Sequence, residues 1–519
     1  MDAKARLRRL TYLAHRWLGV AGCLLMFGWF LSGIVMLYVG YPKLTPEERF
    51  ASLPVLALDA YRMPDAAQAA PGPAVLTSVR GEATFILPTP NGPRAWSAST
   101  GNPNGTVTAD MAVAAARAFW PAGTARHAGL VDEDRWTHSR GLDRHRPLHK
   151  VCMSGEAAGT LYVSSATGEV VLDAPLAQQR WNYVGAWLHW LYMARDRSVD
   201  PVWSWTVIVL SALCTVLAIS GAVVGVWRWR FRGRYKSGAR TPYREVWMRW
   251  HHITGLVFSA FVCTWIFSGL MSMNPGGIFS APHAGPDMQA MTGVQAGTAV
   301  GTAVGTAVGT AVGTAVGTAV STANMAPLPV LQALHDAGFQ AVQLEWRWMA
   351  GDPYVLARDA SADSRIIRRH DGALIVQADW QPQAVIDAAR ALFPDAAMQA
   401  QVLDHYDAYY YARHAEAMNG GAPRGLPVLQ LDFDNAAVNR VYVDLRTGEP
   451  VLSLSRAQRA GRWLFYFLHS WDTPALLNAG VGRDLTIILL SLGGLAICAT
   501  GIVLGARRMK NTVRGSGAR

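Results

Sequence analysis

His251-His252-Ile253-Thr254-Gly255 opens an apolar run that closes on Trp265-Ile266-Phe267-Ser268-Gly269-Leu270-Met271. An earlier run has the same form, because it opens on His15-Arg16-Trp17-Leu18-Gly19 and closes on Trp29-Phe30-Leu31-Ser32-Gly33. The step in residue number from His15 to His251 equals that from Ser32-Gly33 to Ser268-Gly269, and we call it the first repeat offset. Both runs reach the length of about 20 apolar residues that a helix needs to cross a bilayer. The sequence therefore predicts two membrane helices that each carry a histidine at the same end.

Four segments are long and apolar enough to predict membrane-spanning helices. They are residues 17–39, 202–227, 253–273 and 485–504. The formal charge of +11 is concentrated in the tail 1–16, the loop 228–250 and the tail 505–519. All three segments fall on one side of a four-helix protein, as the positive-inside rule requires, so the basic charge indicates topology and not nucleic-acid binding. We therefore expect both termini to be cytoplasmic.

The two long connections, 41–180 and 274–460, are expected outside the membrane as two α+β domains. Interfacial helices are predicted to follow them at 181–193 and 461–472. A second repeat offset relates Thr167-Gly168-Glu169 to Thr447-Gly448-Glu449, and the same step takes Leu188-His189 to Leu468-His469. The chain is therefore interpreted as a tandem duplication of span, exterior domain, interfacial helix and span. Six Gly-Thr-Ala-Val copies at 297–320 are expected to form a flexible insert.

The duplication pairs four histidines. His15 and His251 lie at the cytoplasmic edge of the bundle, and His189 and His469 lie at the outer edge. A twofold axis along the membrane normal keeps each pair at one depth and can bring its members face to face across the helices. Two imidazoles on opposite sides of one plane are what six-coordinate haem iron requires. The sequence thus predicts two haems, with His252 left open as an alternative to His251.

A histidine taken singly has a simpler interpretation. Any one of the four can lie at headgroup level for the same reason as interfacial Trp and Arg, and only their pairing favours ligands. His138, His145 and His149 suggest either a metal site or an exposed basic surface. Of the five cysteines, only Cys152 lies outside the spans, so no disulfide framework is expected. No residue is identified as catalytic.

These features resemble the PepSY-associated transmembrane family. The resemblance rests on His-Arg-Trp-Leu-Gly at 15–19, Phe-Ser-Gly-Leu-Met at 267–271, the two Thr-Gly-Glu turns, and Leu-His-Ser-Trp-Asp-Thr-Pro at 468–474. Members include ferric-siderophore reductases of the bacterial inner membrane, whose histidines hold b-type haems, and iron-regulated membrane proteins of unassigned role. The resemblance implies periplasmic PepSY-like domains and electron transfer outward to a ferric chelate.

Together, the histidine pairs and the resemblance predict a haem-dependent membrane oxidoreductase in the bacterial inner membrane. Two haem b groups would be held through iron by His15, His251, His189 and His469. The expected partners are a cytoplasmic or membrane electron donor, a ferric-siderophore substrate and the lipid bilayer. The alternative is a haem-free scaffold or sensor whose PepSY-like domains bind or inhibit a periplasmic peptidase.

Overall fold

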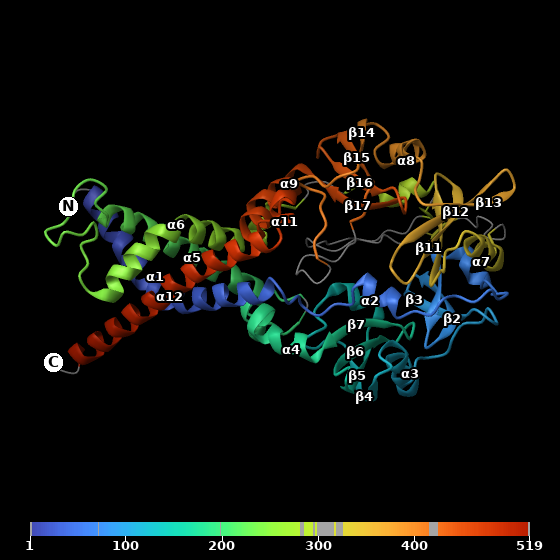
Figure 1. Cartoon of the computed structure of the whole chain (residues 1–519), viewed down its shortest axis with the longest axis horizontal. Coiled ribbons are helices and arrows are strands. Elements are labelled where there is room, and N and C mark those ends of the chain that lie inside the picture. The colour runs from blue at the N-terminus through green and yellow to red at the C-terminus, as the bar shows by residue number, and fades with distance from the viewer. Residues whose placement is uncertain are drawn as a thin grey trace. The chain divides into compact units, whose positions relative to one another are not determined.

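The computed structural model describes residues 3–70, 72–197, 199–280, 285–293, 296–297, 316–317, 325–414 and 424–516. The chain divides into a helical unit, Met1–Gly40, Arg180–Phe279 and Arg459–Arg519, and a β-rich unit, Tyr41–Gln179 and Ser280–Gln458. Figure 1 shows both in colours that follow the sequence. The expected flexible insert lies outside the described residues, except in the short pair β8 (Ala296–Gly297) and β9 (Val316–Gly317).

Four long helices form the helical unit: α1 (Ala3–Met36), α5 (Pro201–Arg228), α6 (Val246–Ser272) and α12 (Val481–Ser516). Each is long and apolar enough to cross a membrane, so the four predicted spans are confirmed as candidate membrane helices. Both α1 and α6 pack against α5 and α12. The first helix ends at Met36, slightly before the predicted boundary at residue 39.

Glycines allow the four helices to approach closely. A Cβ at Gly494 of α12 would lie 2.7 Å from the Phe30 ring of α1, and one at Gly493 would lie 2.4 Å from the Phe258 ring of α6. Only a glycine fits at such a distance. The start of α5 is fixed locally, since the Asp200 side chain accepts a hydrogen bond from the Trp203 N–H at 3.0 Å and Pro201 follows it.

Short helical pieces precede α5 and α12, where the interfacial helices are predicted. Before α5 they are α4 (Leu176–Asn182), the π-helix η3 (Tyr183–Trp187) and η4 (Tyr192–Ala194). Before α12 they are α9 (Arg456–Gly461), the π-helix η9 (Arg462–Phe467), α10 (Leu468–Ser470) and α11 (Pro474–Leu477). Each π-helix is followed by a left-handed residue, Leu191 with φ 55° and Trp471 with φ 52°, and the second repeat offset relates these two residues.

A seven-stranded antiparallel sheet is the centre of the β-rich unit. Its order is β13-β12-β11-β10-β1-β2-β3. The strands are β1 (Ala74–Val79), β2 (Glu82–Thr89), β3 (Gly92–Ser97), β10 (Gln343–Met349), β11 (Asp352–Arg358), β12 (Ser364–His370) and β13 (Ala373–Gln377). Strand β1 pairs with β10, with Leu76 opposite Leu344, so both halves of the chain share one sheet. The structure therefore differs here from the expected two separate domains. Pairing β1 with β10 removes two strand edges whose backbone groups would otherwise lack partners.

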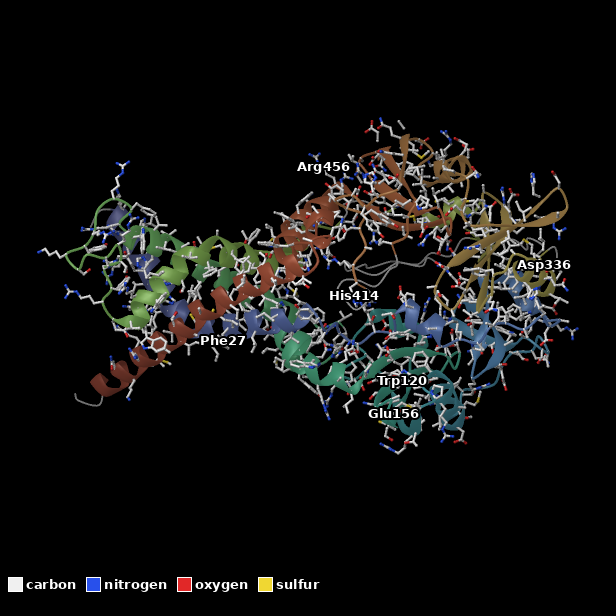
Figure 2. All side chains as sticks on the ribbon, viewed as in Figure 1. Phe27, Trp120, Glu156, Asp336, His414 and Arg456 are labelled. Atoms are coloured by element: carbon white, nitrogen blue, oxygen red, sulfur yellow. The ribbon has the colours of Figure 1, made fainter. Side chains whose placement is uncertain are left out.

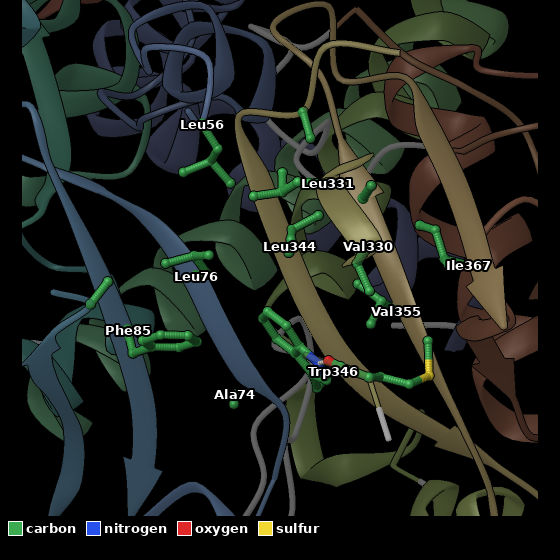
Figure 3. Packing of buried hydrophobic residues seen from close by; sticks show 14 of the residues in the cluster. Leu56, Ala74, Leu76, Phe85, Val330, Leu331, Leu344, Trp346, Val355 and Ile367 are labelled. Atoms are coloured by element: carbon green, nitrogen blue, oxygen red, sulfur yellow. Dashed lines mark hydrogen bonds between the residues drawn. The ribbon is translucent and has the colours of Figure 1, made fainter. Parts of the chain in front are cut away.

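The core beside this sheet is also shared. Figure 3 shows Leu76 and Phe85 from the first half beside Leu344, Trp346 and Val355 from the second. The rings of Phe85 and Trp346 lie 5.7 Å apart between centroids, and the Trp346 indole N–H donates to the Met325 carbonyl at 2.8 Å. Burial of these large side chains stabilises the pairing of the two halves.

Two four-stranded sheets complete the β-rich unit. One comprises β4 (Gly123–Val131), β5 (Leu148–Gly155), β6 (Gly159–Ser164) and β7 (Val170–Pro175), and α3 (Ala109–Phe119) packs on it. The other comprises β14 (Ala397–Leu403), β15 (Val428–Asp434), β16 (Arg440–Asp444) and β17 (Glu449–Leu454), with α8 (Pro382–Ala389) in the same core. The remaining short helices among the described residues are α2 (Pro46–Ala51), α7 (Pro327–Asp336), η1 (Asp65–Ala69), η2 (Arg140–His145), η5 (Pro275–Gly277), η6 (Met288–Thr292) and η8 (Arg390–Leu392).

The two Thr-Gly-Glu turns are connected through the shared sheet by a chain of polar side chains. At one end, Arg49 pairs with Glu169 at 3.1 Å and donates to Gln343 of β10 at 2.7 Å. Gln343 donates to Glu345 at 2.6 Å. At the other end, Arg347 contacts Glu345 and pairs with Glu449 at 2.6 Å. The chain of contacts satisfies buried polar groups on β10 that would otherwise be costly.

The Asp134 carboxylate accepts several hydrogen bonds in the first four-stranded sheet and its surroundings. Lys150 donates to it at 2.6 Å and Tyr162 at 2.8 Å. Burial alone would raise the Asp134 pKa, but hydrogen bonds from Lys150, the Trp136 N–H and Tyr162 lower it below its ordinary value. A carboxyl group of this kind stabilises the fold above its unfolded pKa of about 4, and this stabilisation is lost as the pH falls through its folded pKa.

We therefore expect Asp134→Asn to lower the free energy of unfolding by about 1–3 kcal/mol near neutral pH, because it removes hydrogen bonds to a charged group. The difference from wild type should shrink below about pH 4. Denaturant unfolding followed by tryptophan fluorescence measures both effects. Asp336→Asn is the matched control, since Asp336 lies at the end of α7 with 83% of its side chain exposed (Figure 2). A constant difference between Asp134→Asn and wild type at every pH would contradict the assignment.

Candidate functional site

His15 of α1 and His251 of α6 face each other inside the helical unit. Their ring centroids lie 6.2 Å apart, and the ring planes are inclined by 33°. His15 Nδ1 lies 3.3 Å from the Leu217 carbonyl of α5, and His251 Nδ1 lies 3.2 Å from the Ile497 carbonyl of α12. Because a carbonyl oxygen only accepts, Nδ1 carries the proton in each ring. The Nε2 lone pair, which binds metal ions, is therefore available.

The contacts of His15 and His251 are equivalent. The second repeat offset relates Leu217 to Ile497, and it also relates the two glycines that lie against the rings. A Cβ at Gly221 would lie 2.7 Å from His15 Cε1, and a Cβ at Gly501 would lie 3.4 Å from His251 Cε1. Side chains at these glycines would crowd the imidazoles, most severely at Gly221.

His189 and His469 form the second pair. Their ring centroids lie 6.0 Å apart at an interplanar angle of 71°. Ser32 Oγ lies 3.0 Å from His189 Nδ1, and Ser268 Oγ lies 3.0 Å from His469 Nδ1. Each serine also donates its single hydroxyl proton to a carbonyl of its own helix, so it accepts a proton from Nδ1–H of the histidine. The rings are thereby held in the same tautomer as those of the first pair.

Burial and a neighbouring ring keep His189 of this second pair uncharged. Burial, and then the neighbouring His469 ring, lowers the pKa of His189 to about 3. The neutral imidazole is the form that coordinates metals. Within the described residues, Nε2 of His15, His189 and His251 has no hydrogen-bond partner.

The two pairs are well separated along the helices. On α1, His15 belongs to the first pair and Ser32 contacts His189 of the second. On α6, His251 belongs to the first pair and Ser268 contacts His469 of the second. At a helical rise of about 1.5 Å per residue, each of these spacings corresponds to about 25 Å. This length approaches the thickness of the hydrocarbon core of a bilayer.

The structure distinguishes His251 from His252. His252 is buried, with Nδ1 2.7 Å from Thr241 Oγ1 and Nε2 2.9 Å from the Gly225 carbonyl. Both of its ring nitrogens therefore have protein partners. His251, and not His252, lies opposite His15.

The other candidate histidines each have separate partners. His138 Nδ1 lies 2.5 Å from Glu133, His145 Nδ1 lies 3.0 Å from Ser164, and His149 Nε2 lies 3.1 Å from the Val107 carbonyl. Among the described residues, no three His, Cys, Asp or Glu side chains are grouped to hold a metal ion. That criterion requires three side chains, whereas haem iron takes only two ligands from the protein.

The geometry of the paired histidines can be compared with that of an axially ligated iron. An imidazole nitrogen lies about 2.0 Å from a bound first-row metal and about 1.1 Å from its ring centroid, so two imidazoles on opposite sides of one metal have centroids about 6 Å apart. The observed separations are 6.2 and 6.0 Å. Both separations would allow two imidazoles to bind one metal ion.

Fold and site together define a four-helix membrane protein with two facing histidine pairs and an additional β-rich unit. The model of the family described as PepSY-associated TM region matches residues 12–357, more than half of the chain. The chain belongs to this family. His15, His189 and His251 fall within the matched residues. A search of curated proteins finds no match.

The groups that hold the rings were not predicted from the sequence. Ser32 and Ser268 belong to the Ser-Gly pairs that recur at the first repeat offset, and that recurrence was a usable signal. Thr500, whose Oγ1 lies 3.0 Å from His251 Nδ1, gave no comparable signal. The Leu217 and Ile497 carbonyls cannot be recognised from side-chain identity at all.

We expect His252→Ala to destabilise the helical unit by about 1–3 kcal/mol, because it removes two buried hydrogen bonds, to the Thr241 hydroxyl and to the Gly225 carbonyl. Thermal unfolding in detergent measures this effect. His335→Ala serves as control, since 71% of the His335 side chain is exposed. Equal unfolding temperatures for the two variants would show that the His252 contacts contribute nothing.

Proposed function

We propose that the protein is a di-haem b transmembrane electron carrier that reduces a periplasmic ferric chelate, such as a ferric siderophore. The observation that supports this most strongly is the presence of two facing histidine pairs about 25 Å apart along the spans. His15 and His251 would hold one haem, and His189 and His469 the other. Haem supplies a one-electron Fe(III)/Fe(II) couple when it is bound.

The residues of the chain would orient and tune the two sites. Nδ1–H bonds to the Leu217 and Ile497 carbonyls, and to Ser32 and Ser268, fix the ring orientations and raise the basicity of the opposite nitrogen. The surrounding apolar side chains exclude water and lower the local dielectric, which adjusts the reduction potential.

The direction of transfer follows from the proposed topology. The basic segments 1–16, 228–250 and 505–519 favour a cytoplasmic location for both termini under the positive-inside rule. The His15–His251 pair would then receive electrons from a cytoplasmic or membrane donor, and the β-rich unit would lie in the periplasm of a bacterial inner-membrane protein. Contacts that recur at the two repeat offsets support a tandem duplication as the origin of the two pairs.

The proposed reaction transfers one electron from the donor to each ferric chelate. The iron of the chelate is reduced from Fe(III) to Fe(II), and no bond of the chelating molecule is broken. Hard oxygen ligands hold the softer Fe(II) less tightly, so the metal is released.

The first test is the visible spectrum of protein purified from cells supplied with haem. We expect low-spin haem bands that sharpen on reduction with dithionite, and about two haems per chain. Alanine at any one of His15, His251, His189 or His469 should remove about half of the haem, whereas His252→Ala should retain both haems. Full-length protein without these bands would instead favour the haem-free scaffold or sensor.

A second test uses two glycines of the helical unit. Gly221→Ala places a Cβ 2.7 Å from His15 Cε1, so it should displace that ring and reduce haem content by about half. Gly255→Ala is the matched control, since a Cβ there meets no atom within 4 Å. Haem content is measured per chain as the pyridine haemochrome. Unchanged haem in Gly221→Ala would contradict ligation by His15.

A further inference from the structure

A cavity of about 390 Å³ lies in the β-rich unit. Its walls come from α2 and the residues that follow it, the turn between β1 and β2, the end of α3, and the start of β7. This volume falls in the range of small-molecule sites, about 300–1,000 Å³. None of the residues proposed to bind haem lines it.

Arg80 lies in a tight hairpin turn at the cavity. Arg80 and Gly81 form the two-residue turn between β1 and β2, with φ of 59° and 82°. Such a turn favours Asn, Asp or Gly at its first position, because a side chain with a Cβ is strained at positive φ. Ala350 and Asp371 hold the same position in the β10–β11 and β12–β13 turns, so the backbone there is set by the hairpin. Arg80 lines the cavity.

The charge of the cavity favours an anion. Arg49 is neutralised by Glu169 at 3.1 Å. Arg80 has only a 3.4 Å contact with Glu82, whose side chain is 74% exposed. An ion pair with so exposed a carboxylate is screened by water. The lining therefore has one cationic group in excess, that of Arg80.

Ser78 also lines the cavity, and its hydroxyl is buried. Ser78 is 9% exposed, and in the part of the chain that the structure describes its Oγ has no hydrogen-bond partner. Buried polar atoms are ordinarily hydrogen-bonded, so an isolated hydroxyl indicates a missing partner. A carboxylate oxygen at Arg80 could accept from this hydroxyl as well, whereas a cation could not accept from either group.

We propose that this cavity binds a small organic monoanion. Its carboxylate pairs with the Arg80 guanidinium and, once the Ser78 side chain rotates toward the cavity, accepts from Ser78 Oγ. Its apolar part lies against Ala115, Ala118 and Phe119 of α3. The site is independent of the proposed haem function, because it requires neither haem nor electron transfer.

The test uses full-length protein in lipid nanodiscs, with N-acetyl-L-phenylalanine as the probe and its neutral carboxamide as the matched control. Binding is followed by saturation-transfer NMR and by titration. The acid should bind at least roughly tenfold more tightly than the amide, since only the acid makes a charge-assisted pair with arginine. Equal binding of the two compounds, or no binding of the acid, would overturn the proposal.

Three variants locate the site. Arg80→Gly removes the cation but suits the positive φ, so it should keep or raise the unfolding temperature while the affinity for the acid falls roughly tenfold. Ser78→Ala should weaken binding by a smaller factor and preserve the fold. Arg94→Gln removes one positive charge from an exposed position on β3 and should bind the acid like wild type. Wild-type affinity in Arg80→Gly, or an equal loss in Arg94→Gln, would exclude this cavity.

Discussion

A hydrogen bond at Nδ1 fixes each of the four paired histidine rings, and these bonds depend on the arrangement of the helical unit. The bonded groups belong to different helices from the histidines. His15 of α1 contacts the Leu217 carbonyl of α5, and His251 of α6 contacts the Ile497 carbonyl of α12. The helices must therefore pack in one arrangement for the rings to face each other. The same packing of the spans therefore also builds the site.

The two pairs are held by different kinds of groups. Backbone carbonyls, which cannot rotate away, contact the rings of His15 and His251, and Thr500 Oγ1 of α12 also contacts His251. Serine hydroxyls on α1 and α6 hold His189 and His469, and these histidines follow the π-helical segments η3 and η9. A π-helical turn is a locally irregular segment that is often found at functional sites. The orientation of the second pair thus depends on short irregular segments, whereas that of the first pair depends on the long helices alone.

Much of the helical unit was predictable from the sequence, because membrane helices are long apolar runs and duplicated motifs have constant offsets. The four spans are present, and His15 lies opposite His251 as the first repeat offset suggests. The repeat offset favoured His251 over His252 but left His252 open, because the partner of His252 is Thr241 in the basic loop. The shared sheet was not predictable. Pairing of β1 with β10 leaves no periodic signal in the sequence, since the two strands are separated along the chain by the rest of the first exterior connection, two membrane helices and the start of the second exterior connection.

The pairing of β1 with β10 has a consequence for biosynthesis. A nascent chain completes β1, β2 and β3 long before β10 exists, because α5, α6 and the connections around them are synthesised in between. Until β10 arrives, β1 is an open edge that can pair with a strand from another chain. Its core partner Trp346 is missing over the same interval. The first half of the β-rich unit therefore stays incompletely folded until β10 has been synthesised. During this interval its open edge can pair wrongly or bind a chaperone.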